Sequence, residues 1–348
     1  MTLDDQWAFA GRVAGLVARD YPLAQSYHLD HLSTEMDGIV RRANDMVAES
    51  TGLAVPGMPQ VAIVDRRQWV ERNLASFSRL IGPAEQRLAE RLDVMGDEST
   101  AHDLARRMMA TETGVVLGFL SRKVLGQYEL VIPNDTEADS IAFIGANVLH
   151  IERAHQLRPA DFRLWIALHE AAHRAQFVGV GWMREYFFGL VEELVASARP
   201  EPGRLRRLVR EAYAAMRQGS PMIDERGLLG LLGSPHQREA LDRVQALMCL
   251  LEGHGHVVMD RLGDRTIRTQ RRMSALLKAR RRDPRTAMFF RLTGMEMKIR
   301  QYEMGERFVL AVERRSGWRT LDLAWTAPEA LPTLDEVEEP ERWLARVG

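Results

Sequence analysis

Helical periodicity is the feature that most limits the folds open to this chain. Apolar residues recur every three to four positions in long stretches, each bounded by Gly, Pro or a capping polar residue. Such stretches cover residues 5–21, 32–50, 65–81, 83–96, 181–198, 201–217 and 236–262, and another begins after Pro159 and ends before Gly179. The sequence therefore predicts a mainly α protein.

One segment, residues 127–154, departs from this pattern. It reads QYELVIPNDTEADSIAFIGANVLHIERA, in which two short apolar runs flank the turn-rich PNDTEAD. Two apolar runs around such a turn are typical of a β-hairpin. We expect a small hairpin here, directly before the helix that begins after Pro159.

The length of the chain bounds its domain organisation. Its 348 residues, 46% of them hydrophobic, can fill one large core or two ordinary ones. The helical pattern breaks at MGDEST, which predicts an N-terminal helical region over residues 1–100 and a metal-binding domain over 101–330. One continuous domain is the alternative. Residues 331–348 are acidic and then weakly amphipathic, and they predict a surface tail.

Composition limits the classes of binding partner and the residue types that can bind a metal. The 47 Lys plus Arg against 48 Asp plus Glu give a formal net charge of −1, so no overall field favours nucleic acid or acidic lipid. The arginine-rich segment 261–286 lacks interleaved aromatics and is expected to be a solvated helix face. With no membrane-length apolar run and no basic leader, we expect a cytoplasmic protein. The single cysteine, Cys249, excludes Cys-rich metal modules, so any metal needs His and carboxylate ligands.

The sequence HEAAH, residues 169–173, lies within one of the predicted helices. At about 100° per residue, His169 and His173 lie about 40° apart, on the apolar side of the helix. Two imidazoles one turn apart on an inward face can hold one tetrahedral cation. Arg163 and Arg174 fall more than about 100° away and are expected in solvent.

Glu170 follows the first histidine and projects from the edge of the same face. From there a carboxylate can reach a water at the metal without being a ligand, which is the general-base role in H-E-x-x-H hydrolases. The motif arises by chance in roughly two of a hundred random chains of this composition. Two hydrogen-bonded core histidines are the alternative, but the motif favours zinc, which also gives two buried imidazoles a partner.

A third ligand is expected from LLEGHGHVVMD, residues 250–260. Glu252 and His256 share one helix face, whereas His254 lies about 160° from Glu252 and is expected to point away. We predict Glu252 as the third ligand. His256 is the alternative ligand, or it orients a ligand histidine or contacts the substrate. Asp260 either accepts a hydrogen bond from a ligand imidazole or is a solvated acid at the helix end.

The chain resembles a zincin-like family of bacterial, mainly actinobacterial, proteins in three blocks of sequence. The blocks are LWIALHEAAHRAQF with VGWMREYF, ALDRVQALMCLLEGHGHVVMD, and RLTGMEMKIRQYEMGERFV, and the resemblance extends over roughly residues 60–315. Family members are described as zinc-dependent metalloproteases or hydrolases of unknown substrate, and some carry a label of association with deazaflavin coenzyme biosynthesis.

The resemblance implies a largely helical zincin-like fold with a metal site at matching positions of this chain. Zinc would be held by His169, His173 and Glu252, with Glu170 as the base. Better-known glutamate zincins often have an Asp four residues after the ligand Glu, where this chain has His256.

Together these residues predict a zinc-dependent metallohydrolase that cleaves an amide bond, in a peptide or a small amide, with Glu170 as general base. An oxyanion donor is also expected, and Arg300, Tyr302 or His256 can supply it. The alternative is a non-catalytic binding or scaffold protein with a structural zinc, since a zinc that links two helices contributes folding energy. The sequence specifies neither the substrate nor an oligomeric state.

Overall fold

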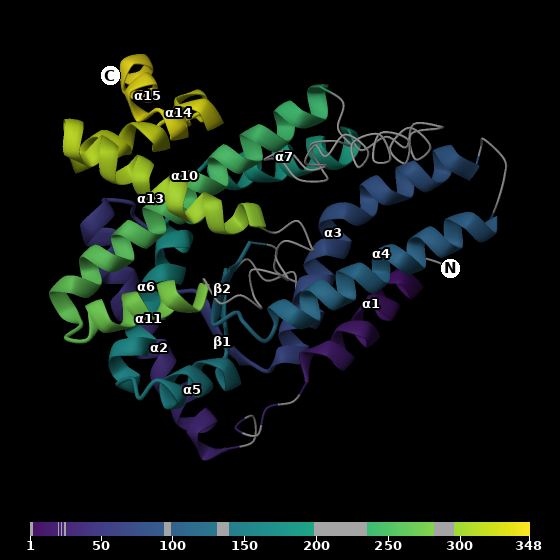
Figure 1. Ribbon diagram of the computed structural model, residues 1–348, viewed down its shortest axis with the longest axis horizontal. Helices are drawn as coiled ribbons and strands as arrows, with labels where there is room; N and C mark the ends of the chain where they lie inside the picture. The colour runs from purple at the N-terminus through teal and green to yellow at the C-terminus, as the bar shows by residue number, and fades with distance from the viewer. Residues whose placement is uncertain are drawn as a thin grey trace, which may run out of the picture. The chain divides into compact units, whose positions relative to one another are not determined.

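The computed structural model describes residues 3–19, 21, 23, 26–93, 99–130, 139–197, 235–281 and 296–348. These residues form many helices and one small sheet, so the prediction of a mainly α fold is confirmed (Figure 1). Contacts divide the chain into two compact units, one of residues 1–184 with 254–279 and the other of residues 185–253 with 280–348. Most of the predicted boundary at 95–100, and all of the predicted helix at 201–217, lie outside the described residues.

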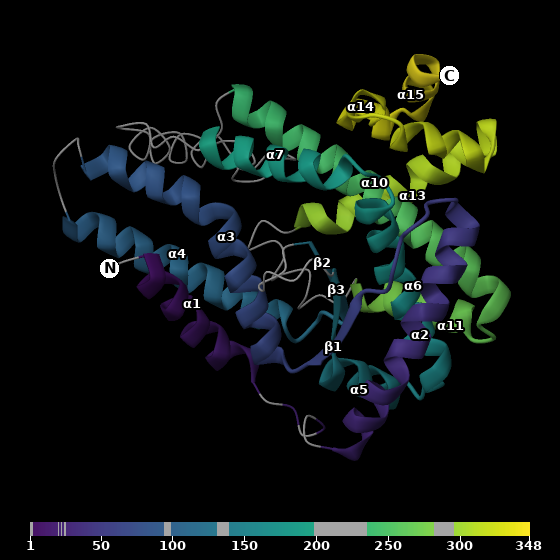
Figure 2. The ribbon, with the colours of Figure 1, turned by 180° about the vertical axis from the view of Figure 1, so that it is seen from behind.

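In the first unit, the N-terminal helix α1 (Leu3–Ala18) packs along α4 (Ser99–Leu120), as both ribbon views show (Figures 1 and 2). The two backbones approach closely because glycines face the contact. A Cβ atom added to Gly118 would lie 2.6 Å from the carbonyl oxygen of Ala14. The close fit depends on the absence of a side chain there.

Helix α3 (Arg66–Asp93) packs against α1 in the same unit. The sequence predicted two helices here, over residues 65–81 and 83–96, because Gly82 and Pro83 separate the two apolar patterns. One helix instead continues through both residues. A proline inside a helix removes one backbone donor, but α3 continues past Pro83 to Asp93.

A three-stranded sheet lies in the first unit, in the order β1-β3-β2. β2 (Gly126–Glu129) and β3 (Ser140–Ile144) pair antiparallel, which confirms the predicted hairpin, and α5 (Gly145–Ala154) follows at once. β1 (Gln60–Val64) pairs parallel with β3 and was not predicted. All five residues of β3 are buried, and the sheet leaves β2 at one edge.

Helix α6 (Pro159–Val178), which carries the HEAAH sequence, packs against α2 (Tyr27–Thr51) and against β2. The expectation that Arg163 and Arg174 lie in solvent is wrong, because they are only 6% and 1% exposed. Neighbouring elements cover α6 on nearly all sides, so its polar face is satisfied by charge-assisted hydrogen bonds instead of water. The pairs are Arg163 with Glu152 and Glu35, and Arg174 with Asp139.

Helix α10 (Pro235–Thr266) runs without interruption through Gly253 and Gly255. Gly253 allows close packing, whereas a side chain at Gly255 would make ordinary contacts. A Cβ atom on Gly253 would lie 2.1 Å from the backbone carbonyl carbon of Gly305, whereas one on Gly255 would lie 3.5 Å from Cε1 of His173. A short helix, α11 (Gln270–Arg281), follows.

The second unit includes most of α7 (Met183–Ser197) and all of α13 (Glu296–Ser316). The C-terminal residues, expected as a surface tail, form short helices that include α14 (Leu334–Glu338) and α15 (Pro340–Val347). Trp343 is fully buried against Phe308, and its indole N–H donates to the carbonyl of Ala330. Two 3-10 helices, Trp318–Trp325 and Pro328–Ala330, connect α13 to them. None of the described helices combines the length and apolarity that a membrane crossing requires.

Candidate metal centre

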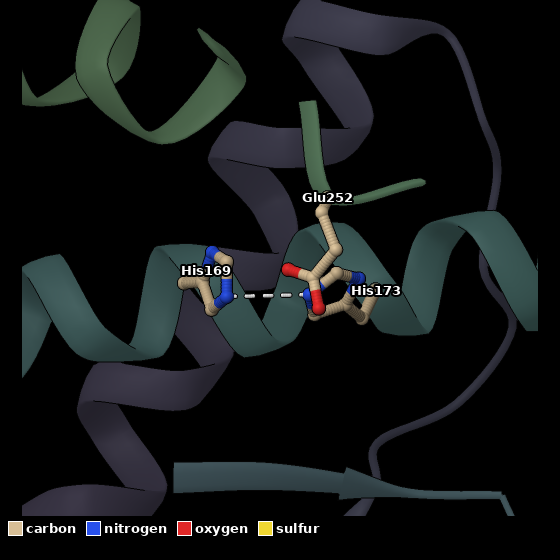
Figure 3. A group of neighbouring side chains, drawn as sticks. All are labelled: His169, His173 and Glu252. Atoms are coloured by element: carbon tan, nitrogen blue, oxygen red, sulfur yellow. Dashed lines mark hydrogen bonds between the residues drawn. The ribbon is translucent and has the colours of Figure 1, made fainter. Parts of the chain in front are cut away.

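The two histidines of HEAAH turn their rings toward one another on the same side of α6 (Figure 3). Their Nε2 atoms lie 3.2 Å apart, and the rings are inclined by 78°. Both residues are half-buried. The helical spacing of His169 and His173 produces this pairing, as the sequence predicted.

The third member of the group is Glu252 of α10. His169, His173 and Glu252 each offer a ligand atom, and these atoms all lie within 4.8 Å of one another (Figure 3). Just beyond Glu252 the same helix contacts α6, since Nδ1 of His254 lies 3.0 Å from Nε2 of Gln176. Because α10 is one continuous helix, this contact also determines where Glu252 lies.

This donor set fits a zinc ion. Two imidazole nitrogens and one carboxylate oxygen are the ligands of many catalytic zinc sites, which keep a fourth position for water or substrate. Two nitrogens bound to one tetrahedral ion at about 2.0–2.1 Å are about 3.3–3.4 Å apart. The Nε2 atoms are thus nearly at the required separation already.

The buried side-chain amide of Gln176 contacts His173 at Nδ1, the nitrogen opposite the one that faces His169. Nδ1 of His173 lies 3.0 Å from Oε1 of Gln176, and Nε2 of Gln176 lies 3.0 Å from Nδ1 of His254. Burial, reinforced by the charges of His173 and Arg261, lowers the pKa of His254 to about 3, so this ring is neutral near pH 7. The expectation that His254 points away from the first helix is wrong, because its ring is buried and meets Gln176 of α6.

The carboxylate of Glu170 contacts the edge strand β2. Its Oε2 atom accepts a hydrogen bond of 2.8 Å from the backbone N–H of Tyr128 in β2. The side chain is almost fully buried and lies over Gly126, where an added Cβ atom would be 2.9 Å from Oε1. The bare backbone of Gly126 therefore makes room for Glu170.

The remaining predicted site residues are His256, Asp260, Arg300 and Tyr302. His256 is buried in a group with Asp260, whose Oδ2 atom lies 3.6 Å from its Nε2 atom. Asp260 also accepts a hydrogen bond of 2.6 Å from Gln270. Asp260 thus lies beside His256. Of the two candidates for the third ligand, Glu252 lies in the group with His169 and His173, and His256 lies in the group with Asp260. Arg300 and Tyr302 lie in α13, but their side chains are outside the described ones.

Sequence reasoning did not single out Gln176. It lies three residues after His173, the spacing at which two side chains on a helix can meet. That spacing is the signal that could have revealed it. Its second partner, His254, is 78 residues further along the chain and follows from no local pattern.

Comparisons with known proteins identify a family and a similar solved structure. The model of a family described as zincin-like metallopeptidases matches residues 6–344. The chain is also similar, at 29% identity and with a TM-score of 0.68, to the crystal structure of a presumed hydrolase with a novel fold from Chloroflexus aurantiacus. That similarity covers 98% of this chain and 97% of the other, and no curated protein matches. Because the family model spans nearly its whole length, the chain belongs to the zincin-like metallopeptidase family.

Proposed function

We propose that the protein is a zinc-dependent hydrolase of amide bonds, with a peptide or a small amide as substrate. The observation that carries the proposal is the meeting of His169, His173 and Glu252 within ligand distance, with Glu170 next in sequence to the first histidine. The family and the similarity to a presumed hydrolase support the same reaction class. We place the reaction in the cytoplasm, because the single Cys249 allows no internal disulfide.

Each residue has a distinct role in this proposal. His169, His173 and Glu252 would hold the ion, which supplies a Lewis acid for the substrate carbonyl and raises the acidity of a nearby water. Glu170 takes the proton of the attacking water and later returns it to the leaving amine. Oε2 of Glu170 accepts the N–H of Tyr128, which holds the carboxylate against β2.

The test combines metal analysis with cleavage of a mixed peptide library, followed by mass spectrometry. Wild-type protein should contain about one zinc per chain and cut a defined subset of peptides. Glu170→Gln should keep the zinc and lose at least about 100-fold in turnover, because general-base catalysis contributes roughly 10²–10⁴-fold. Glu129→Gln is the matched control, since Glu129 is also a buried carboxylate on a neighbouring element and accepts hydrogen bonds from Arg72 and Ser140.

The structural-zinc alternative predicts a different outcome. A zinc that only links α6 and α10 would stabilise the fold, and neither the wild type nor Glu170→Gln would then cleave any peptide or small amide. Zinc without turnover across peptide and small-amide libraries would overturn the hydrolase proposal and favour this alternative. A protein without zinc would exclude both.

A further inference from the structure

We propose that Gln176 and His254 form a buried chain of hydrogen bonds that holds His173 in the one neutral tautomer able to bind zinc through Nε2. This inference deepens the proposed function and rests on it. Neither residue would touch the metal or the substrate, so both are positioning residues. The chain runs from Nδ1 of His173 through the Gln176 amide to Nδ1 of His254, with both steps at 3.0 Å.

The tautomer of His173 decides whether it can be a ligand. A neutral imidazole carries one proton, and only the nitrogen without it can bind a metal. Nε2 of His173 faces His169, so metal binding at Nε2 requires the proton on Nδ1. The carbonyl oxygen of Gln176 accepts a hydrogen bond from that Nδ1–H, which stabilises the required form.

An amide alone does not fix the tautomer, because it can rotate by 180° and present its NH₂ group instead. A rotated Gln176 would donate to Nδ1 of His173 and stabilise the form with the proton on Nε2, which cannot bind zinc. His254 resists this rotation, because its Nδ1 atom accepts the NH₂ group of the observed orientation. Rotation would bring the amide oxygen against that acceptor, and His254 would then have to change tautomer as well.

Burial strengthens the coupling between the three side chains. Gln176 is fully buried and His254 is 2% exposed, so water does not readily replace a lost hydrogen bond in this chain. The contact also joins α6 to α10 directly behind the ligand pair. The same amide therefore orients a ligand and helps to hold the helix that carries Glu252.

The first test uses the wild-type protein without metal. Nitrogen-15 NMR of labelled histidine distinguishes the two neutral tautomers, and Asn substitutions assign the signals among the ten histidines of the chain. We expect the proton on Nδ1 in His173 and on Nε2 in His254. A metal-free His173 with its proton on Nε2 would overturn the inference, and the measurement requires no activity.

The second test measures zinc affinity by competition with a chelator. Gln176→Met, which removes both hydrogen bonds, should weaken zinc binding by about 10- to 100-fold, the usual effect of losing an outer-sphere partner. Gln176→Glu, which keeps an acceptor for Nδ1–H, should stay within about threefold of the wild type. For His254, Asn can replace the Nδ1 acceptor and Leu cannot, so His254→Asn should bind zinc more tightly than His254→Leu.

Asn147→Leu controls for the general cost of removing a buried amide, because Asn147 donates to Ser121 and Val124, outside the metal site. It should lower the thermal stability and leave zinc affinity unchanged. Wild-type zinc binding that Gln176→Met does not weaken would overturn this inference alone. Absence of zinc binding to the wild type would overturn the proposed function as well.

Discussion

The backbone N–H of Tyr128 donates a hydrogen bond of 2.8 Å to Oε2 of Glu170 and so joins the edge strand β2 to the candidate base. The strand fixes the carboxylate by a main-chain donor, which no substitution at Tyr128 other than proline removes. Gly126 completes the arrangement, because Glu170 occupies the space that a side chain at this position would fill. The position of Glu170 thus depends on the path of β2.

Gly126→Ala should displace Glu170 and leave the metal ligands in place. The added Cβ atom would lie 2.9 Å from both Cγ and Oε1 of Glu170, so the carboxylate has to move. We expect turnover to fall by about 10- to 100-fold, since small misplacements of a catalytic group have effects of this size, with zinc affinity within about twofold of the wild type. Gly38→Ala is the control, because nothing lies within 4 Å of a Cβ atom there. Equal turnover of the two variants would contradict the role given to Gly126.

Glu252→Gln and His256→Gln should separate the two candidates for the third ligand. If Glu252 is the ligand, its substitution should weaken zinc binding by more than about 100-fold, beyond the effect of outer-sphere residues. His256→Gln should weaken it by less than about tenfold, because His256 lies in a separate group with Asp260. Isothermal titration with zinc measures both. The reverse order of the two affinities would transfer the ligand role to His256.

Removal of the metal should destabilise the protein. A ligand that binds only the folded state adds about 4 kcal/mol to the free energy of unfolding at a thousandfold excess over its dissociation constant. Thermal unfolding after treatment with a chelator should therefore occur at a lower temperature, and added zinc should restore the original transition. His169→Ala should unfold at the same temperature with and without zinc. A variant that still responds to zinc would place the stabilising ion elsewhere.

Arg174→Met should be among the most destabilising substitutions outside the metal site. Arg174 is 1% exposed, pairs with Asp139 and also donates to the carbonyl of Pro56. Removing one partner of a buried ion pair costs roughly 3–5 kcal/mol, because the other charge remains without compensation. The double variant with Asp139→Leu should recover part of this loss. Urea denaturation measures the free energy of unfolding. A decrease below about 1 kcal/mol for Arg174→Met would contradict the role given to the Arg174–Asp139 pair.

Acid should weaken the C-terminal helices through Glu336. Hydrogen bonds from Arg346, aided by those from Thr333, hold the pKa of Glu336 below its usual value, although burial opposes them. A carboxyl group with a lowered folded-state pKa stabilises the protein above its unfolded-state pKa, and this contribution is lost as the pH falls through the folded-state value.

Glu336→Gln should thus reduce stability near neutral pH and flatten its decline below about pH 4.5. Thermal unfolding between pH 7 and pH 3 measures the difference. Identical pH profiles for the two proteins would show that the Glu336–Arg346 pair does not contribute to acid sensitivity.

Local patterns predicted several of the helices, although not α4, and they predicted the histidine pair. Helical periodicity and the spacing of His169 and His173 depend only on nearby residues. The face shared by residues of α10 also identified Glu252 as the carboxylate that meets this pair. The zinc and the roles of these residues remain predictions. Helices and the faces that their residues share can be predicted from a short stretch of sequence, because the helical repeat alone determines them.

Features that depend on distant partners could not be predicted in this way. β1 is a short strand whose parallel pairing with β3 brings together residues about eighty positions apart. Arg174 was expected in solvent, because the angular position of a residue on one helix does not reveal what covers the other side. His254 was misplaced for the same reason, since it meets Gln176 on a face that seemed to lead away from the metal.

Helix α10 carries both Glu252 and His254, only two residues apart. A shift of this helix by one residue would turn every side chain by about 100°. The Glu252 carboxylate and the His254 ring would then both move away from α6. In the proposed zinc site, the affinity for the ion therefore depends on the register of α10 against α6. A substitution elsewhere in α10 that shifts the helix along α6 should therefore lower the affinity for zinc.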